Sequence, residues 1–294
     1  MNNVPKQSSE WFNTLDFVWF TTVKKILTEG IEVSPRDRLT KELPQHTVQV
    51  NMNYPVLTFP GRKLSYKFMA AEAFWILSGD DTVEGIAPWN KHIAQFSDDG
   101  HRFYGAYGPR IIEQLGHVIE KLTADRETRQ AVITTWRPNP EKSKDIPCTV
   151  SFDFKIREDK LNLHVFMRSS DVWLGLPYDV FNFSMLAFAV CCILNAKHIE
   201  KHIRQEAPDG ERLVTPGVLY LTAASSHLYQ ENFEQAEKCL WEIGQLSPTK
   251  PVPGHLSFCP MERQGLTHVL QFLKSLRESS KGDDIRWWEQ SAWN

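Results

Sequence analysis

Two alternating stretches followed by a long apolar one constrain the fold of this chain more than any other feature of its sequence. Apolar residues alternate with polar ones over residues 150–156 and again over 161–167, with a charged turn between the two runs. Alternation with a period of two predicts a pair of adjacent β-strands. Pro177 and Asp179 then open a segment over 180–194 that is apolar on nearly every side and predicts a buried helix. Enclosing that helix requires a large core, and 294 residues with 41% hydrophobic content can supply one.

Polar residues gather at the ends of these predicted elements. Cys148 stands where the first strand begins, Arg168 and Asp171 follow the second strand, and Asp179 stands at the entrance to the helix. A thiol, a guanidinium and two carboxylates around an apolar frame indicate a functional site, because charged groups are costly to bury without partners. For Cys148 alone, the alternative is a small core residue.

Three short motifs carry a resemblance to a known family. They are Pro-Cys at 147–148, Arg-Ser-x-Asp at 168–171 and Leu-Gly-x-Pro-Tyr-Asp at 174–179. In order, spacing and local pattern they resemble the thymidylate synthase family, and most closely its pyrimidine nucleotide hydroxymethylase branch. Further matches run from about residue 36 to 229.

The resemblance implies a fold and an assembly. The fold class would be α/β (α+β), with a large mixed or antiparallel sheet packed with helices, and two copies would pair sheet to sheet as a homodimer. We expect a single domain over residues 1–294, with its core at 9–245 and a divergent extension at 246–294. This extension does not resemble the synthase C-terminus that closes over the folate. One of its tryptophans, Trp287, Trp288 or Trp293, could take over that closure.

The resemblance also assigns residues to a pyrimidine nucleoside monophosphate. Cys148 matches the nucleophile, and Arg168 and Ser169 match residues that hold the phosphate. His227 and Tyr229 match the pair that binds the sugar hydroxyl; two residues apart on extended backbone, they would point the same way.

Two more arginines are expected at the phosphate. Arg36 is the better match to the loop arginine that folds over the nucleotide, and Arg38 is the alternative. Arg129 is expected to reach the phosphate of the partner subunit. The family usually has a second arginine beside it, but Gln130 stands there, so the expected clamp is one charge short.

A glutamate and a tyrosine complete the expected catalytic set. Glu72 lies among apolar residues of a predicted helix and matches the catalytic glutamate of the family. Tyr107 matches a tyrosine near the cysteine, although an aromatic residue packing at a helix start explains it equally well. The implied one-carbon co-substrate is 5,10-methylenetetrahydrofolate, with Trp89, Asp171 and Gly175 on its side of the site. We expect no metal.

The chemistry of pyrimidines explains why a thiol is needed. Carbon-5 of the ring is a poor nucleophile, and a thiolate that adds to carbon-6 turns the ring into an enamine or enolate equivalent. Arg168 is expected to lower the pKa of Cys148 and so to favour the thiolate.

Asp179 is the residue that predicts the base. Thymidylate synthases have asparagine at this position, and its amide can pair with uracil. A cytosine adduct presents two N–H donors, which a carboxylate can accept, whereas the carboxylate would repel the uracil carbonyl. Helix capping by Asp179 is an alternative that does not exclude base recognition. Thr149 after Cys148 and Met167 before Arg168 also depart from synthases and resemble a phage-type deoxycytidylate hydroxymethylase.

We therefore predict conversion of dCMP to 5-hydroxymethyl-dCMP. The alternatives are a CMP hydroxymethylase of a nucleoside-antibiotic or thiamin-analogue pathway and a dCMP methylase. From other classes, they are a catalytically inactive synthase-like binding module and an unrelated Cys–His hydrolase. The intact set of candidate residues argues against an inactive module, and no histidine lies near Cys148 in sequence to serve a hydrolase.

Composition excludes some partners and environments. The net charge of −3 and pI near 6.4 provide no overall basic field for nucleic acid. The five cysteines lack the spacing of a metal site and suit a reducing compartment. Without a signal-peptide pattern, and with an apolar helix that is short for a membrane span, we expect a cytoplasmic protein, in a bacterium or in the host cell of a phage.

The rest of the chain is predicted to add three helices and three strands. A helix should run from a cap at Ser8 or Ser9 to Gly30, and another over 63–77 should end before Gly79. The remaining elements are expected at 110–122 for a helix and at 47–52, 131–136 and 217–222 for strands.

Overall fold

The computed structural model describes residues 13–140, 142–205, 212–245, 255–256, 265–286 and 288. The helices are α1 (Leu15–Glu29), α2 (Tyr66–Leu77), α3 (Val83–Ile86), α4 (Tyr107–Ala124), α5 (Leu176–Ile203), α6 (Phe233–Gln245) and α7 (Leu266–Glu278). The strands are β1 (Ile31–Val33), β2 (Thr40–Asn51), β3 (Val132–Thr134), β4 (Thr149–Arg157), β5 (Lys160–Met167), β6 (Ser170–Asp171) and β7 (Thr215–Tyr229).

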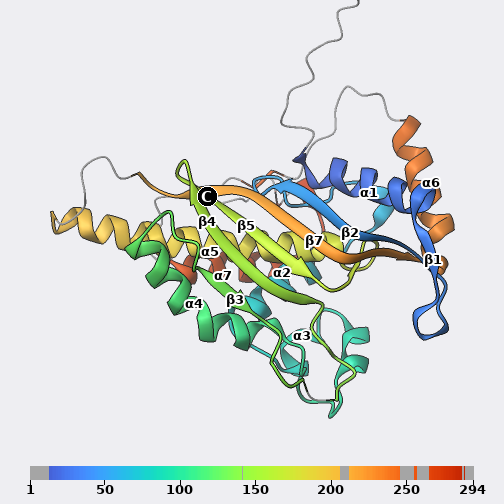
Figure 1. Cartoon of the computed structure of the whole chain (residues 1–294), viewed down its shortest axis with the longest axis horizontal. Helices are drawn as coiled ribbons and strands as arrows, with labels where there is room; N and C mark the ends of the chain where they lie inside the picture. The colour runs from blue at the N-terminus through green and yellow to red at the C-terminus, as the bar shows by residue number, and fades with distance from the viewer. Residues whose placement is uncertain are drawn as a thin grey trace, which may run out of the picture.

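One mixed sheet organises the fold. Its strand order is β1-β2-β7-β5-β4-β3, with the short β6 also paired to β7. The β5–β7 and β6–β7 pairs are parallel and the other pairs are antiparallel. Figure 1 shows α2, α5 and α7 together behind the long strands. The expected fold class, a mixed sheet packed with helices, is confirmed.

The central hairpin forms as the alternation predicted. β4 and β5 pair in register from Arg157 opposite Lys160 to Ser151 opposite Phe166, and after a bulge Thr149 lies opposite Met167. The turn residues Glu158 and Asp159 have positive φ angles. Every apolar member of the alternating set on β5 is buried, while its polar neighbours face the other way. The register therefore places the start of β4 beside the end of β5.

Helix α5 is the core element on which the sheet packs. Its residues from Val180 to Cys192 are all buried, which accounts for a sequence with almost no polar face. At 28 residues it is longer than predicted, and by length and composition alone it could cross a membrane. Most of its apolar window is instead enclosed by the sheet and by the other helices.

Several element boundaries differ from the prediction. α1 is capped by Thr14, whose side chain accepts from Phe17 N, and the proposed caps Ser8 and Ser9 lie outside the described residues. α4 begins at Tyr107 and not at Arg110. β7 runs on to Tyr229, because its residues from Val218 to Tyr229 pair with β2. The predicted stop at Gly79 is confirmed by its φ of 74°, just beyond the end of α2.

The C-terminal extension contributes to the same core as the rest of the chain. α7 packs against α2 and α5 through Val269, Phe272, Leu273 and Leu276. Trp288 is fully buried, with its ring against Tyr66 and its Nε1 donating to Gly282 O at 2.8 Å. The hypothesis that Trp288 closes over a ligand is therefore wrong, because the ring fills the interior. Trp287 and Trp293 lie outside the described residues.

Removing the Trp288 ring should destabilise the whole fold. We expect Trp288→Ala to lower the free energy of unfolding by about 3–5 kcal/mol, the usual cost of deleting a large buried aromatic side chain. Chemical denaturation measures this loss. Trp241→Ala is the matched control, because that ring is 67% exposed and its removal should change stability by less than about 0.5 kcal/mol. Equal stabilities of the two variants would contradict the placement of the extension.

Candidate active site

The end of the hairpin brings Cys148 and Arg168 together. Cys148 immediately precedes β4 and Arg168 immediately follows β5, and Arg168 N donates to Cys148 O at 2.8 Å. The guanidinium donates from Nε to Pro147 O and from Nη2 to Ile146 O, both at 2.9 Å. Its Nη2 also lies 3.7 Å from the Cys148 sulfur. Arg168 is thus held by three carbonyls of the cysteine loop and still reaches the thiol.

The loop before Cys148 is fixed by the turn that leads into α4. Asp145 Oδ2 accepts from Gly105 N at 2.7 Å, and Tyr107 Oη accepts from Thr149 N at 3.1 Å. A Cβ on Gly105 would lie 2.7 Å from Asp145 O, so a glycine is needed for this close approach. Tyr107, which could have been a packing residue only, therefore contacts the residue after the cysteine.

A cavity of about 590 Å³ opens beside Arg168. Arg36, Ser169, His227 and Tyr229 line it together with Arg168, as do Pro35, Thr40, Glu42, Trp136, Ile146 and Ser225. Five of the seven residues expected at the nucleotide therefore share one cavity. The concentration of cationic and hydroxyl groups at one end suits a phosphate monoester.

The structure separates the two loop arginines. Arg36 lines the cavity, whereas Arg38 stacks on the Tyr229 ring with its Cζ 3.9 Å from the centroid and pairs with Glu231. Arg38 therefore packs against Tyr229, and Arg36 is the loop arginine that lines the nucleotide cavity. Arg129 is exposed and does not line the cavity of its own chain.

Strand β7 delivers the histidine and tyrosine to the same place. His227 is buried, and its Nδ1 lies 3.4 Å from Ser169 Oγ; its ring is 5.1 Å from that of Tyr229. The parallel pairing of β6 with β7 sets Asp171 opposite His227. The extended backbone thus presents both side chains to one side, as the two-residue spacing predicted.

Two further carboxyl groups of the candidate site lie on helices: Glu72 on α2 and Asp179 on α5. Glu72 on α2 accepts from Asn182 Nδ2 on α5 at 2.7 Å, and burial raises the Glu72 pKa to about 7. Burial also raises the pKa of Asp179 well above its usual range, and the nearby Glu72 and Asp171 carboxylates raise it further. Burial and the neighbouring negative charges therefore favour the protonated form of Asp179.

Sequence reasoning missed Asn182. It lies three residues after Asp179, and this spacing puts the two side chains on one face of a helix. The signal was present as a polar residue inside an apolar helix, where an amide is costly unless it is paired.

Asp179 does not cap α5. The cap is Gly175, which has no side chain to bond, and Asp179 N donates to Gly175 O within the first turn. No hydrogen bond to the Asp179 carboxyl is found among the described residues. A Cβ on Gly175 would lie 3.2 Å from Asp179 Oδ2 and from Asp171 O, so the glycine leaves room between the two acids. The capping alternative is thereby removed.

The residues expected at the folate, Trp89, Asp171 and Gly175, are each partly exposed. Asp171 Oδ1 accepts from Trp173 N at 2.8 Å and from Leu174 N at 2.9 Å, which orients the carboxyl group. Burial raises the pKa of Asp171. Trp89 is half-buried, and the Arg277 guanidinium of α7 lies 5.5 Å from its ring. Among the described residues, no group of three His, Cys, Asp or Glu side chains could hold a metal ion.

Arg168 lowers the pKa of Cys148, as expected, but the net pKa of the thiol in the free protein is still raised. Burial raises the pKa of the thiol above its ordinary value of 9.0, and this outweighs the lowering by Arg168. Asp179 and Asp145 raise the pKa further, because their negative charges oppose a thiolate. The thiol is therefore the resting form of this site.

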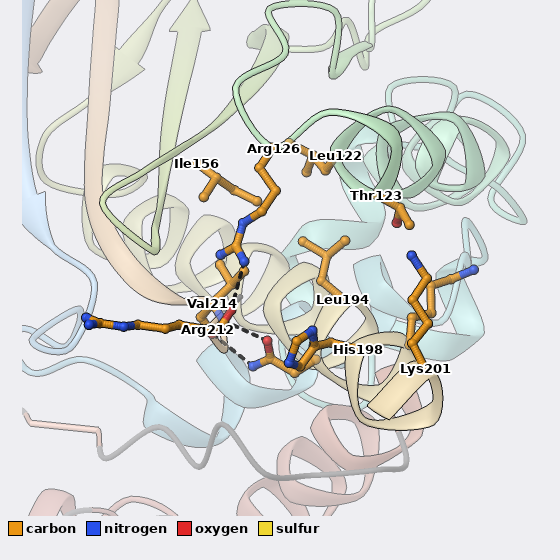
Figure 2. A pocket seen from close by; sticks show the side chains of 11 residues that line it. Leu122, Thr123, Arg126, Ile156, Leu194, His198, Lys201, Arg212 and Val214 are labelled. Atoms are coloured by element: carbon orange, nitrogen blue, oxygen red, sulfur yellow. Dashed lines mark hydrogen bonds between the residues drawn. The ribbon is translucent and has the colours of Figure 1, made fainter. Parts of the chain in front are cut away.

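A second pocket, drawn in Figure 2, shares no lining residue with the first. At about 30 Å³ it accommodates little more than a water molecule. Its polar groups serve the backbone: Arg126 Nη1 donates to Arg212 O at 2.8 Å, and Asn195 exchanges two hydrogen bonds with Val214. In Figure 2 the side chains of Arg212 and Lys201 point away from each other, so the cations around this pocket do not converge on one ligand.

Comparison with known proteins identifies the family to which the chain belongs. A family model described as thymidylate synthase matches residues 18–205, more than half of the chain. The chain belongs to the thymidylate synthase family. It is also similar to a deoxyuridylate hydroxymethyltransferase of Bacillus phage SP01, at 33% identity over 180 residues. That alignment covers 54% of this chain and 46% of the relative, so it spans less than half of the relative's length.

The family match ends before β7 begins. His227 and Tyr229 therefore lie outside the matched residues, and their position rests on the pairing of β7 with β2, β5 and β6. Members of this family bind a pyrimidine nucleotide and use methylenetetrahydrofolate, which fits the cationic cavity and the acids beside it.

The pKa of Cys148 can be measured by alkylation. We expect the iodoacetamide rate of the free protein to rise with a midpoint above 9.0, because burial disfavours the thiolate. Arg168→Leu should move the midpoint higher still, since it removes the cation nearest to the sulfur. Cys148→Ser reports the background from the other cysteines. A midpoint that Arg168→Leu leaves unchanged or lowers would contradict the assigned contact.

Proposed function

We propose that the protein is a deoxycytidylate 5-hydroxymethyltransferase. It would convert dCMP, 5,10-methylenetetrahydrofolate and water to 5-hydroxymethyl-dCMP and tetrahydrofolate. The single observation that carries the choice of base is Asp179, a buried carboxyl group with no capping role whose pKa is raised by burial and by the nearby Glu72 and Asp171. The hydroxymethyl product is further supported by the name of the phage relative, although that protein is named for deoxyuridylate.

The protonation of Asp179 explains how cytosine would be favoured. Its raised pKa favours the protonated carboxyl group, and in that form Asp179 would donate to the ring nitrogen of cytosine and accept from the amino group. As Cys148 adds to carbon-6, the ring nitrogen becomes basic and takes that proton. The carboxylate left behind accepts two N–H groups from a cytosine adduct. A uracil adduct would present one N–H and an oxyanion, which a carboxylate repels.

The cavity supplies the remaining nucleotide contacts. Arg36 and Arg168 would pair with the phosphate, and Ser169 would donate to it. His227 and Tyr229 would bind a sugar hydroxyl.

Cys148 and Glu72 would carry out the bond changes at the base. The sulfur adds to carbon-6 and leaves once carbon-5 is substituted. Glu72, whose pKa near 7 allows it to exchange protons at neutral pH, would take the proton of the water that attacks the one-carbon unit. Methylenetetrahydrofolate supplies that unit, and Trp89, Asp171 and Gly175 are the residues that would hold it.

The assembly we propose is a homodimer formed through the sheet. The strand face turned away from the helices carries Phe166, which is 42% exposed, and the stacked rings of His164 and Tyr220. Arg129 is exposed at the sheet edge just before β3 and would contribute to the partner's phosphate site. The site is thus expected to be complete only in the dimer.

Product analysis tests the proposal. We expect mass spectrometry to show hydroxymethyl product from dCMP and methylenetetrahydrofolate, without the absorbance rise that accompanies formation of dihydrofolate. CMP and dUMP, run in parallel, should turn over more slowly. Methyl product with stoichiometric dihydrofolate would identify a methylase, and faster turnover of CMP or dUMP would overturn the choice of substrate.

Asp179→Asn tests the reading of the base. The amide cannot supply a proton to the ring nitrogen, so the preference for dCMP over dUMP should fall by about 10- to 100-fold in relative kcat/KM. Asp16→Asn is a control, because that buried carboxyl group bonds Thr58 and Phe59, outside the nucleotide cavity. An Asp179→Asn variant with unchanged selectivity would show that another residue reads the base.

A further inference from the structure

We propose that Asn182 is a positioning residue that holds the Glu72 carboxylate for its water and thereby decides between hydroxymethyl and methyl products. This inference rests on the proposed hydroxymethyl transfer. It concerns a residue with no place in the sequence motifs that defined the site.

The contact is short, buried and specific. Asn182 Nδ2 donates to Glu72 Oε2 at 2.7 Å across the interface between α5 and α2, and the asparagine is 3% exposed. A side-chain amide that donates to a carboxylate stabilises its ionised form, so Asn182 opposes the effect of burial on Glu72. Without this amide, Glu72 would hold its proton more tightly and would be a poorer acceptor for a proton from water.

The carbonyl oxygen of the Asn182 amide indicates where a water could bind. Asn182 Oδ1 is buried and has no hydrogen-bond partner among the described residues. An unpaired buried acceptor is rare and costly in folded proteins, and it marks a place where water or a ligand completes the bonding. With Nδ2 on Glu72, Oδ1 can accept from a water that Glu72 also binds.

Other charged groups around Glu72 do not provide this function. Asp179 and Tyr178 face it from the first turn of α5, and each acts on Glu72 as an acid whose ionisation would disfavour the Glu72 charge. A neutral donor is therefore the group on α5 that can keep Glu72 ionised beside a second carboxyl group. Asn182, one turn after Asp179, occupies that position.

Asn182 would control the addition of water to the one-carbon unit. Once carbon-5 has lost its proton and the bond from the one-carbon unit to the folate has broken, tetrahydrofolate would still be bound beside the nucleotide, which holds an exocyclic methylene at carbon-5 and the Cys148 sulfur at carbon-6. The water oxygen bonds to the methylene, and Glu72 takes one water proton while the electron pair moves into the ring. The ring then expels the sulfur and regains its 5,6 double bond, and the proton on Glu72 compensates for the one that Cys148 regains as a thiol. If the water is poorly placed, hydride from tetrahydrofolate competes and gives methyl product and dihydrofolate.

Asn182→Ala tests the inference through three measurements. We expect the hydroxymethyl kcat to fall by about 10- to 100-fold, the range for loss of a hydrogen bond to a charged group. The KM for dCMP should stay within about threefold, because Asn182 binds no substrate. The acid limb of the kcat profile should move to higher pH, and the share of product that appears with dihydrofolate should rise.

Two further variants separate positioning from stability. Asn195→Ala removes another buried asparagine of α5, one that bonds the backbone of Val214, and it should cost stability without moving the pH profile or the product ratio. Asn182→Asp keeps the shape but donates only when protonated. The ratio of its activity to that of wild type at the same pH should therefore be highest at low pH and should fall as the pH rises.

The outcomes distinguish this inference from the proposed function. If wild-type protein forms only methyl product, the proposed function fails whatever the variants do. If wild type forms hydroxymethyl product but Asn182→Ala matches Asn195→Ala in pH profile and product ratio, the inference is overturned and Asn182 is a structural residue.

Discussion

The enclosure of Glu72 and Asp179 against the apolar helix α5 is the constraint on which the rest of this structure depends. Burial raises the pKa of both carboxyl groups, and the charge of Glu72 raises the pKa of Asp179 further. Burying two carboxyl groups is unfavourable in free energy. The amide of Asn182 on α5 offsets part of this by donating to Glu72, and the sheet keeps the helix in place. In return, the site has groups that can give and take protons near neutral pH, which general acid–base chemistry requires.

Much of this arrangement was accessible from sequence because it follows from short-range rules. Alternation predicted the β4–β5 hairpin, and the hairpin register alone brings Cys148 to Arg168. The His-x-Tyr spacing predicted two side chains on one side of a strand, and β7 delivers both to the same cavity. The roles of these residues in turnover stay predictions until they are measured.

What sequence reasoning missed depends on contacts between distant segments. The partner of Glu72 is 110 residues away on another helix, and only packing brings Asn182 to it. The lowering of the Cys148 pKa by Arg168 was predicted with the right sign, but the larger and opposite effect of burial was not predicted. Trp288 was read as a possible lid, whereas α7 folds the extension back on α2 and makes its ring part of the interior.

The central claim is that Cys148 attacks a cytosine nucleotide held by Asp179, and a mechanism-based adduct tests it most directly. With 5-fluoro-dCMP and methylenetetrahydrofolate, loss of the carbon-5 substituent is blocked, so the covalent complex should accumulate. The account predicts a peptide containing Cys148 whose mass increases by the nucleotide and the folate, formed faster than with 5-fluoro-dUMP. Absence of an adduct at Cys148, or a faster adduct with the uracil analogue, would contradict it.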